Sequence, residues 1–467
     1  MRMQNRKSQR VEVNHTGARV RDRIWSLALI FFLSACSGGG GGSSGTAAQN
    51  TNASAAPVSG GATGTGTVNY WLDDLFPTKN FTGMRASIQA ATINNPDAAN
   101  LINCTVRVQT NSSCNFNLIP LIGMQYTTPT VDQIMSKVLV SHDWMAVRMR
   151  QILEAMPAET LLMTRGISAI VISFDVRPSF YFPITSAIYI DPNTLWLSEV
   201  ERATIDPTPD FRSGFGGELQ FTMPWRYVAP GDQDLRSLDR DLYSVTLRTT
   251  SLFYHELAHA NDYFYPASLP TINRNIPIQN LSVSPRSSLL AGTFPLQSQL
   301  MFNLAEISFG GATANTIQRA LTAEDVAFEF PADVANDFYN FYTRREDFAM
   351  VFEEAMMLYS YAIDRDVAVT NLPQTSNDCV DYVVAWGQRN RVTDNSIKPR
   401  ALLAVDAILP EVSSSVENLL DSYAPSQMRV GEDFCSNIFF GANGARALLR
   451  SNREPKTLAP EVIVPYW

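Results

Sequence analysis

The chain has 467 residues, of which 45% are hydrophobic and 17% charged, a composition typical of a globular protein with one large domain or two modest ones. The formal net charge is −9, and the first 35 residues carry seven basic and two acidic side chains, which leaves −14 on the rest. Because so acidic a body repels phosphate backbones, we expect no nucleic-acid partner.

The N-terminus predicts a lipoprotein signal. A basic stretch that ends at Arg23 precedes twelve mostly apolar residues and then Cys36. Twelve residues are too few to cross a bilayer, which takes about 20, but they suit the core of a signal peptide. Leu-Ser-Ala-Cys at 33–36 resembles the lipobox of bacterial lipoproteins, in which the signal is removed before the cysteine and the cysteine is lipidated. The alternative is an ordinary secretory signal with an incidental cysteine.

These features divide the chain into three parts. Residues 1–35 are expected to be the signal peptide, and Ser37 after the lipidated Cys36 resembles the pattern that sorts lipoproteins to the outer membrane. Residues 36–67 contain Gly, Ser, Ala, Thr and Asn without apolar periodicity, which predicts a flexible tether. Residues 68–467 are then expected to form the folded domain.

The folded part is expected to be of the α+β class. A helix is predicted over 132–156 because apolar residues recur at helical spacing: Ile134, Val138, His142, Met145, Met149 and Ile152. The other expected elements, in chain order, are strands over 167–176 and 186–190, a helix from 236 to about 265, a loop-rich insertion over 270–311 with one short helix near Leu300, and a long helix over 343–363. Strands before the second helix and helices after it predict a small sheet packed on that helix and a mostly helical C-terminal part.

Four cysteines remain in the expected domain, an even number for an oxidising compartment. Cys104 and Cys114 flank a polar turn, so we expect them to close a local loop. Cys379 and Cys435 are then left for each other. Neither pair has the spacing of zinc ligands, and all four are therefore predicted to form structural disulfides.

Residues 255–259, His-Glu-Leu-Ala-His, match the H-E-x-x-H pattern. Side chains four residues apart on a helix share one face. His255 and His259 can therefore bind one tetrahedral Zn²⁺, while Glu256 acts as general base toward the attacking water. The alternative is an accidental match on a surface helix, but two of the chain's four histidines stand at this spacing within a helical pattern.

A catalytic zinc site needs a third protein ligand. Asp262 and Tyr265 stand where the metzincin pattern has Gly and His, which excludes that group. The remaining candidates are His142 and a carboxylate further along the chain. Glu346, at the start of the predicted helix 343–363, lies 87 residues after His259.

Together these residues resemble the glutamate zincins, and among them the anthrax lethal factor type. In that type H-E-x-x-H is followed after two residues by Asp, and the third ligand lies in Glu-x-Phe-Ala-Glu-x-Phe. The matching residues here are His255, Glu256, His259, Asp262, Glu346, Phe348, Ala349 and Phe352. The resemblance implies a zincin-like fold, with His255, His259 and Glu346 as zinc ligands and Glu256 as the base.

The resemblance covers roughly 253–264 and 339–352, and the chain departs from the pattern twice. Met350 replaces the second Glu, and the separation between the ligands is much longer. Glu346 also has an alternative role, because Thr343 three residues before it fits a capping box in which the Glu only bonds the backbone. The other possible ligands are Asp347, Glu353 and Glu354, while His142 is interpreted as a packed histidine.

Tyr339 precedes Glu346 by seven residues, the spacing at which enzymes resembling lethal factor place a tyrosine that faces the zinc. A phenol at that position can donate a hydrogen bond to the oxyanion of the transition state. Tyr342 is a rival for this role. Alternatively, Tyr339 is one of a run of aromatic residues that pack the start of the helix.

The sequence therefore predicts a zinc-dependent metallohydrolase, specifically a peptidase that cleaves a peptide or protein. The predicted lipid anchor places it on the bacterial cell envelope at the outer membrane, facing the periplasm or the exterior. The alternative is a non-catalytic envelope lipoprotein that keeps the zinc-binding fold as a structural or binding module. Glu256 argues against this alternative, since a structural zinc site needs no base.

Overall fold

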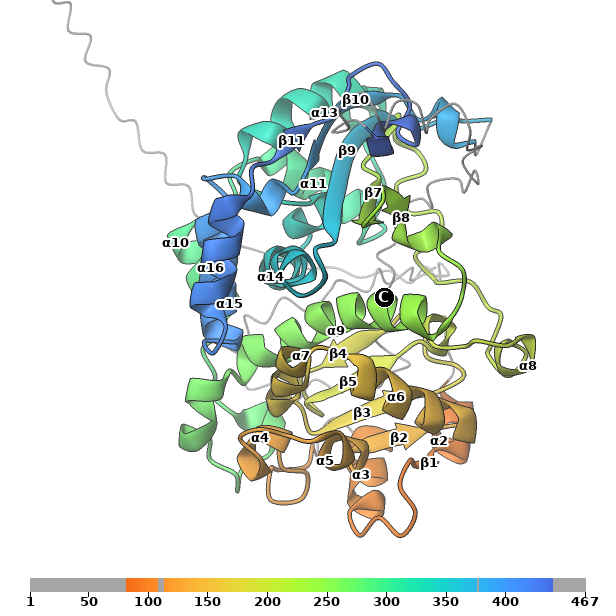
Figure 1. Ribbon diagram of the computed structural model, residues 1–467, viewed down its shortest axis with the longest axis vertical. Helices are drawn as coiled ribbons and strands as arrows, with labels where there is room; N and C mark the ends of the chain where they lie inside the picture. Colours follow the sequence, from red (N-terminus) through yellow and green to blue (C-terminus); the bar gives the residue numbers. More distant parts are fainter. Residues whose placement is uncertain (1–80, 108–112, 376–377, 440–467) are drawn as a thin grey trace, which may run out of the picture. The chain divides into compact units, whose positions relative to one another are not determined.

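The computed structural model describes residues 81–107, 113–375 and 378–439, which combine helices with two small sheets (Figure 1). The predicted signal peptide (1–35) and the predicted tether with Cys36 (36–67) lie outside the described residues. Within the described ranges, no helix is both long and apolar enough to cross a membrane.

The first sheet has five short strands in the order β1-β2-β3-β5-β4. Their bounds are Gln89–Ala90 (β1), Val138–Val140 (β2), Ala169–Ile172 (β3), Phe180–Phe182 (β4) and Ala187–Ile190 (β5). The three central strands are parallel, and β1 and β4 pair antiparallel at the edges. Every residue of β2, β3 and β5 is buried, as is usual for parallel strands covered on both faces. Strands therefore form near both predicted positions, 167–176 and 186–190.

The predicted helix over 132–156 is wrong, because the segment contains two helices and a strand. It is divided into α5 (Val131–Met135), β2 and α6 (Asp143–Ala155). The apolar run at 138–140 is buried between β1 and β3, where β-branched residues pack well. His142 then adopts an extended backbone at the N-cap position of α6, without a hydrogen bond from its side chain to the helix. The apolar residues of the expected stripe are buried, but they reach the core from different elements.

The H-E-x-x-H motif lies on α9 (Leu242–Tyr263). This helix begins six residues later than predicted because the Asp241 side chain accepts the amide of Ser244 and caps it. The helix is buried along almost its whole length. On one side it contacts β4 and β5 of the first sheet together with α6 and α7 (Ala158–Met163), and on the other it packs against a second long helix (Figure 1).

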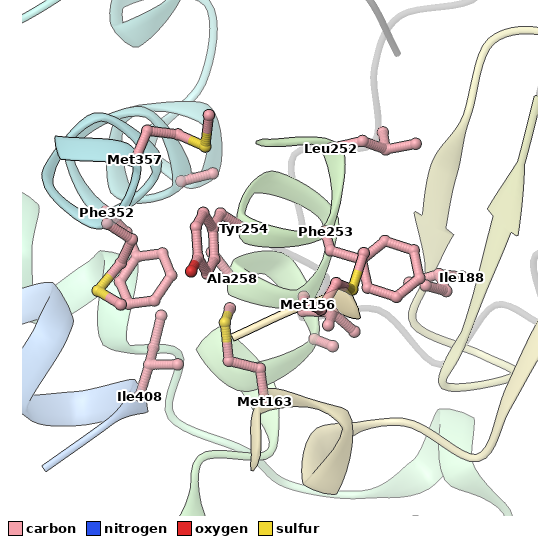
Figure 2. Close-up of a cluster of buried hydrophobic side chains, with 14 of the residues drawn as sticks. Met156, Met163, Ile188, Leu252, Phe253, Tyr254, Ala258, Phe352, Met357 and Ile408 are labelled. Carbon is pink, nitrogen blue, oxygen red and sulfur yellow. The ribbon is translucent and has the colours of Figure 1, made fainter. Parts of the chain in front are cut away.

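That second long helix is α14 (Arg344–Tyr361), close to the predicted 343–363. Thr343 caps its start, and Ala362 ends it in the left-handed conformation, with φ of 51°. The helix packs against α9 through an apolar core in which the rings of Tyr254 and Phe352 lie 6.1 Å apart (Figure 2). Helices α15 (Lys398–Ile408) and α16 (Ser413–Ser422) pack on α14 and complete this core.

The described C-terminal part is mostly helical, as expected, but it also contributes three strands to a second sheet that was not predicted. The six strands of this sheet pair antiparallel in the order β11-β10-β9-β7-β8, with β6 also paired to β9. Their bounds are Phe221–Thr222 (β6), Trp225–Ala229 (β7), Gln233–Asp234 (β8), Asp364–Asn371 (β9), Val384–Arg389 (β10) and Ser426–Gln427 (β11). The central strand β9 begins with three charged residues, 364–366, of which Arg365 and Asp366 are fully buried in ion pairs. Because consecutive charged residues are typical of exposed segments, the sequence pattern did not predict a buried strand here.

The segment between α9 and α14 contains more helix than expected. One short helix was predicted near Leu300, and α11 (Gln299–Ser308) occupies that place. The segment also contains α10 (Arg286–Thr293), α12 (Thr316–Ala320) and α13 (Ala323–Glu329).

Both predicted cysteine pairs are close in space. Cys104, on α3 (Ala98–Thr105), is bonded to Cys114 with 5.6 Å between the Cα atoms. Cys379, in the connection between β9 and β10, is bonded to Cys435 near the end of the described chain, with 5.8 Å between the Cα atoms. The second bond therefore ties the last described segment to the second sheet.

Candidate metal centre

Three predicted ligands converge where α9 and α14 pack together. Nε2 of His255 lies 3.2 Å from Nε2 of His259, and both nitrogens face Oε2 of Glu346, at 3.0 Å and 3.2 Å respectively. Among the residues that the structure describes, this is the one group of three or more His, Cys, Asp or Glu side chains whose ligand atoms are grouped closely enough to hold a metal ion.

The separations between these atoms suit a zinc ion. Ligand atoms about 2.0–2.1 Å from a tetrahedral Zn²⁺ lie about 3.3 Å from one another, close to the 3.0–3.2 Å found between His255, His259 and Glu346. Two imidazoles and one carboxylate are also the ligands of a common class of catalytic zinc site. The donor set and its spacing therefore fit zinc.

The candidate centre is buried on one side and reaches solvent on the other. His255 is 1% exposed, whereas the side chains of His259 and Glu346 are 12% and 16% exposed. Structural zinc sites are closed by four protein ligands, while catalytic sites keep a position for water and substrate. Three grouped ligands beside solvent match the catalytic arrangement.

The electrostatics of the group favour a bound cation. Burial acts to raise the pKa of Glu346, but the charge of His259 and the hydrogen bonds from both histidines hold that pKa well below its usual range. Burial acts to lower the pKa of His255, yet Glu346 and Glu353 raise it to about 10. The carboxylates thus stabilise positive charge at this place, and they would stabilise a bound divalent cation in the same way.

Glu256 lies beside the three candidate ligands with an unusual carboxylate. The residue is 3% exposed, and its Oε2 atom is buried without a hydrogen-bond partner among the described residues. Burial raises the pKa of this carboxyl group above its ordinary value, although His255 and His259 act against the shift. A buried acceptor without a partner is costly and calls for an explanation. A role of Glu256 as a base that accepts a proton at this centre would explain the unpaired oxygen.

The capping role and the ligand role of Glu346 do not exclude each other. Thr343 Oγ1 accepts a hydrogen bond from the backbone N–H of Glu346 at 3.2 Å, so the cap uses the backbone of Glu346. The carboxylate meanwhile lies against the two histidines. The side chain of Glu346 is therefore available as a ligand while its amide is capped.

The rival third ligands have partners of their own. Three of them form hydrogen bonds with residues outside the candidate centre. Asp347 accepts a hydrogen bond from Arg400, and Glu354 accepts one from Asn336. The ring of His142 is hydrogen-bonded to the hydroxyl group of Ser141. His142 also meets Phe174 edge to face, as expected of a packed histidine.

Glu353, the fourth alternative ligand, contacts His255 on the ring edge opposite to Glu346. Its Oε2 lies 3.2 Å from Nδ1 of His255, the ring nitrogen that faces away from Glu346. Its Oε1 accepts hydrogen bonds from Tyr227 at 2.7 Å and from Ser251 at 2.9 Å. From the sequence, Glu353 was expected only as an alternative ligand, so this contact was missed. Its spacing of seven residues from Glu346, about two helical turns, is the signal that both carboxylates face α9.

Among the described residues, Tyr339 stacks on the ring of His255. It lies on the short 3-10 helix η7 (Phe338–Phe341), and its ring is 6.1 Å from that of His255 with 22° between the planes. Tyr342 stacks on Tyr339 at 5.8 Å. Burial and the charge of Glu346 raise the pKa of Tyr339 well above its ordinary value. The phenol therefore keeps its proton and remains a hydrogen-bond donor.

Comparisons with known proteins add no family to this description. No family model, curated protein or solved structure matches the chain. Its function is therefore inferred from the geometry and chemistry of these residues.

Proposed function

We propose that this protein is a zinc-dependent peptidase of the glutamate-zincin type, with His255, His259 and Glu346 as metal ligands. The observation that carries the proposal is the convergence of two imidazole nitrogens and one carboxylate oxygen, 3.0–3.2 Å apart, at a place that solvent reaches. A fold of the zincin type is part of the proposal. The packing of α9 against a small mixed sheet supports it.

In the proposed mechanism each residue has a separate task. Zinc, when bound, supplies Lewis acidity that polarises the scissile carbonyl and makes a water molecule easier to deprotonate. Glu256 takes the proton from the attacking water and passes it to the leaving amine. Tyr339 donates a hydrogen bond to the oxygen of the carbonyl as negative charge develops there. Amide hydrolysis then needs no covalent link between enzyme and substrate.

Catalysis is favoured over a purely structural zinc site by Glu256. A structural site is complete with its ligands, and a buried carboxylate oxygen without a partner would only destabilise it. The cost is understandable if the carboxylate works as a base on water. The partial exposure of His259 and Glu346 supports the same conclusion, because substrate has to reach the metal.

The site of action is proposed from the N-terminal sequence. Cys36 in the Leu-Ser-Ala-Cys context is proposed to carry lipid, and the Gly- and Ser-rich residues after it to tether the enzyme to the outer membrane. The substrate would then be a peptide or protein of the cell envelope or its surroundings.

The proposal is tested with the full-length protein purified in detergent. We expect about one zinc per chain by elemental analysis, together with cleavage of a broad library of quenched fluorescent peptides. A chelator should abolish the cleavage and added Zn²⁺ should restore it. Zinc bound without turnover of any peptide would favour the non-catalytic lipoprotein, and protein that binds no zinc would contradict both functions.

A further inference from the structure

A continuous chain of buried charges runs behind the candidate metal centre. It consists of Glu353 on α14, Arg365 on β9 and Asp337 at the start of η7. All three side chains are at most 3% exposed. Burying charges is costly unless each is paired and hydrogen-bonded. A connected set of three at this place therefore calls for a role.

One end of the chain of charges is the first histidine. Glu353 lies 3.2 Å from Nδ1 of His255 and is itself fixed by the hydroxyl groups of Tyr227 and Ser251. A carboxylate on one ring nitrogen sets the orientation of the imidazole and fixes which nitrogen carries the proton. The other nitrogen, Nε2, is then presented toward His259 and Glu346.

The other end is the tyrosine segment. Oδ1 of Asp337 accepts the backbone N–H of Tyr339 at 2.9 Å, and the side chain of Asn340 bonds the backbone N–H of Asp337 in return. This reciprocal cap fixes the short helix that carries Tyr339. The position of the Tyr339 ring beside His255 therefore depends on where Asp337 is held.

Arg365 joins the two ends. One terminal nitrogen donates to Oδ2 of Asp337 at 2.7 Å, and the other lies 3.6 Å from Oε1 of Glu353. The guanidinium also lies over the rings of Trp225 and Tyr227, at 4.1 Å and 5.1 Å, which fixes its plane. A planar fork with several donors can hold two carboxylates at once, which a lysine cannot do in the same geometry.

We propose that Glu353, Arg365 and Asp337 are positioning residues that align a zinc ligand, His255, with the transition-state donor, Tyr339. This inference rests on the proposed function, since it gives both residues a part in the same reaction. Arg365 lies between the two carboxylates, with a hydrogen bond to Asp337 and an ion-pair contact to Glu353, and so links the metal side of the site to the oxyanion side. A shift of about 1 Å in such a geometry is enough to slow an enzyme about a hundredfold.

The two ends are tested by isosteric substitutions in the full-length protein. Glu353→Gln should weaken zinc binding by roughly 10- to 100-fold, the usual effect of losing an outer partner of a ligand, as measured by chelator competition. In Asp337→Asn the amide oxygen can still accept the backbone N–H of Tyr339. The amide NH₂ group then faces Arg365, so the hydrogen bond from Arg365 is lost. This variant should lower kcat about tenfold with little change in KM or in zinc affinity, because its effect passes through the transition-state donor.

Coupling through Tyr339 is tested by combining variants. In a Tyr339→Phe background there is no phenol left to misplace, so adding Asp337→Asn should lower kcat by less than about twofold. Arg365→Lys should both weaken zinc binding and lower kcat, because it loosens both carboxylates. A purely structural role would leave the Asp337→Asn effect equally large in both backgrounds.

Arg226→Lys is the matched control. Arg226 stands beside Tyr227 on β7, is as buried as Arg365, and is paired with Asp366 rather than with Glu353 or Asp337. Its variant should lose thermal stability but keep the zinc affinity and kcat of the wild type. The inference is overturned if Glu353→Gln binds zinc as tightly as wild type, or if Asp337→Asn and Tyr339→Phe act independently. Wild-type protein that lacks zinc or turnover would instead contradict the proposed function.

Discussion

Nδ1 of His255 lies 3.2 Å from Glu353, and Nε2 of the same ring lies 3.0 Å from Glu346, so one helix holds the imidazole from both edges. The two carboxylates are seven residues apart on α14. Because they project from the same face of that helix, the geometry of the centre is set by how α14 packs on α9. The large apolar contact between these helices therefore stabilises the site as well as the fold.

The two roles of Glu346 can be separated by mutation. Glu346→Gln removes the ligand charge but leaves the backbone N–H that Thr343 caps, so helix stability should be retained. Zinc affinity should fall by more than about 100-fold, since losing a ligand costs more than losing an outer partner. Thr343→Ala is the control, with an expected loss of about 1 kcal/mol of stability and unchanged zinc affinity. Wild-type zinc affinity in Glu346→Gln would leave Glu346 with the capping role alone.

Tyr339 is expected to act on the transition state without binding the metal. Tyr339→Phe should lower kcat by roughly two to three decades, the range for losing an oxyanion donor, with zinc content unchanged. Tyr342→Phe should have a smaller effect, because Tyr342 stacks on Tyr339, while Tyr339 itself stacks on His255. Steady-state kinetics on one peptide substrate decide between them. An inactive Tyr342→Phe beside a fully active Tyr339→Phe would assign the role to Tyr342.

The two disulfides are expected to contribute unequally to stability. They close loops with sequence separations of 10 and 56 residues. Loop-closure entropy then predicts contributions of about 3 kcal/mol for Cys104–Cys114 and about 4 kcal/mol for Cys379–Cys435. Denaturant unfolding of the paired Cys→Ser variants should show this order, and peptide mapping without reductant should recover both links. Free thiols at these positions in exported protein would contradict the pairing.

The lipid anchor is tested independently of the metal site. Cys36→Ser removes the proposed acylation nucleophile, so the variant should move from the membrane fraction to the soluble fraction on cell fractionation. Its peptidase activity should be unchanged, because the substitution is far in sequence from the proposed site. A variant that stays as firmly bound to membranes as the wild type would contradict the lipoprotein assignment.

The two long helices could be predicted from the sequence, whereas the true structure of 132–156 could not. α9 and α14 have continuous periodic patterns, and Pro266 follows the end of α9. The run at 138–140 is shorter than one helical turn, and its position between β1 and β3 becomes visible only when the partner strands are known. Local periodicity cannot distinguish such a strand from a turn of helix.

The second sheet and the chain of charges depend on contacts that are distant in sequence. β9 contains Arg365 and Asp366, and charged residues in a sequence usually indicate an exposed segment. The structure shows instead that both are buried and paired with Asp337 and Arg226 on other elements. His255, Glu256 and His259 are encoded locally by their spacing. Glu346 was found through resemblance, and Arg365 could not have been found, because its partners lie 12 and 28 residues earlier in the chain. The candidate ligands and the candidate base could therefore be predicted from the sequence, whereas the buried charged residues behind them could not.

The central claim, that the centre is catalytic, is tested most directly by Glu256→Gln. If Glu256 is a base and not a metal ligand, the variant should fold normally and retain about one zinc per chain. The amide is almost the same size as the carboxyl group but cannot accept the proton of the attacking water. We therefore expect at least about a hundredfold loss of kcat on a peptide that the wild type cleaves, the minimum for loss of a general base. Wild-type turnover by zinc-loaded Glu256→Gln would contradict the catalytic role of the centre.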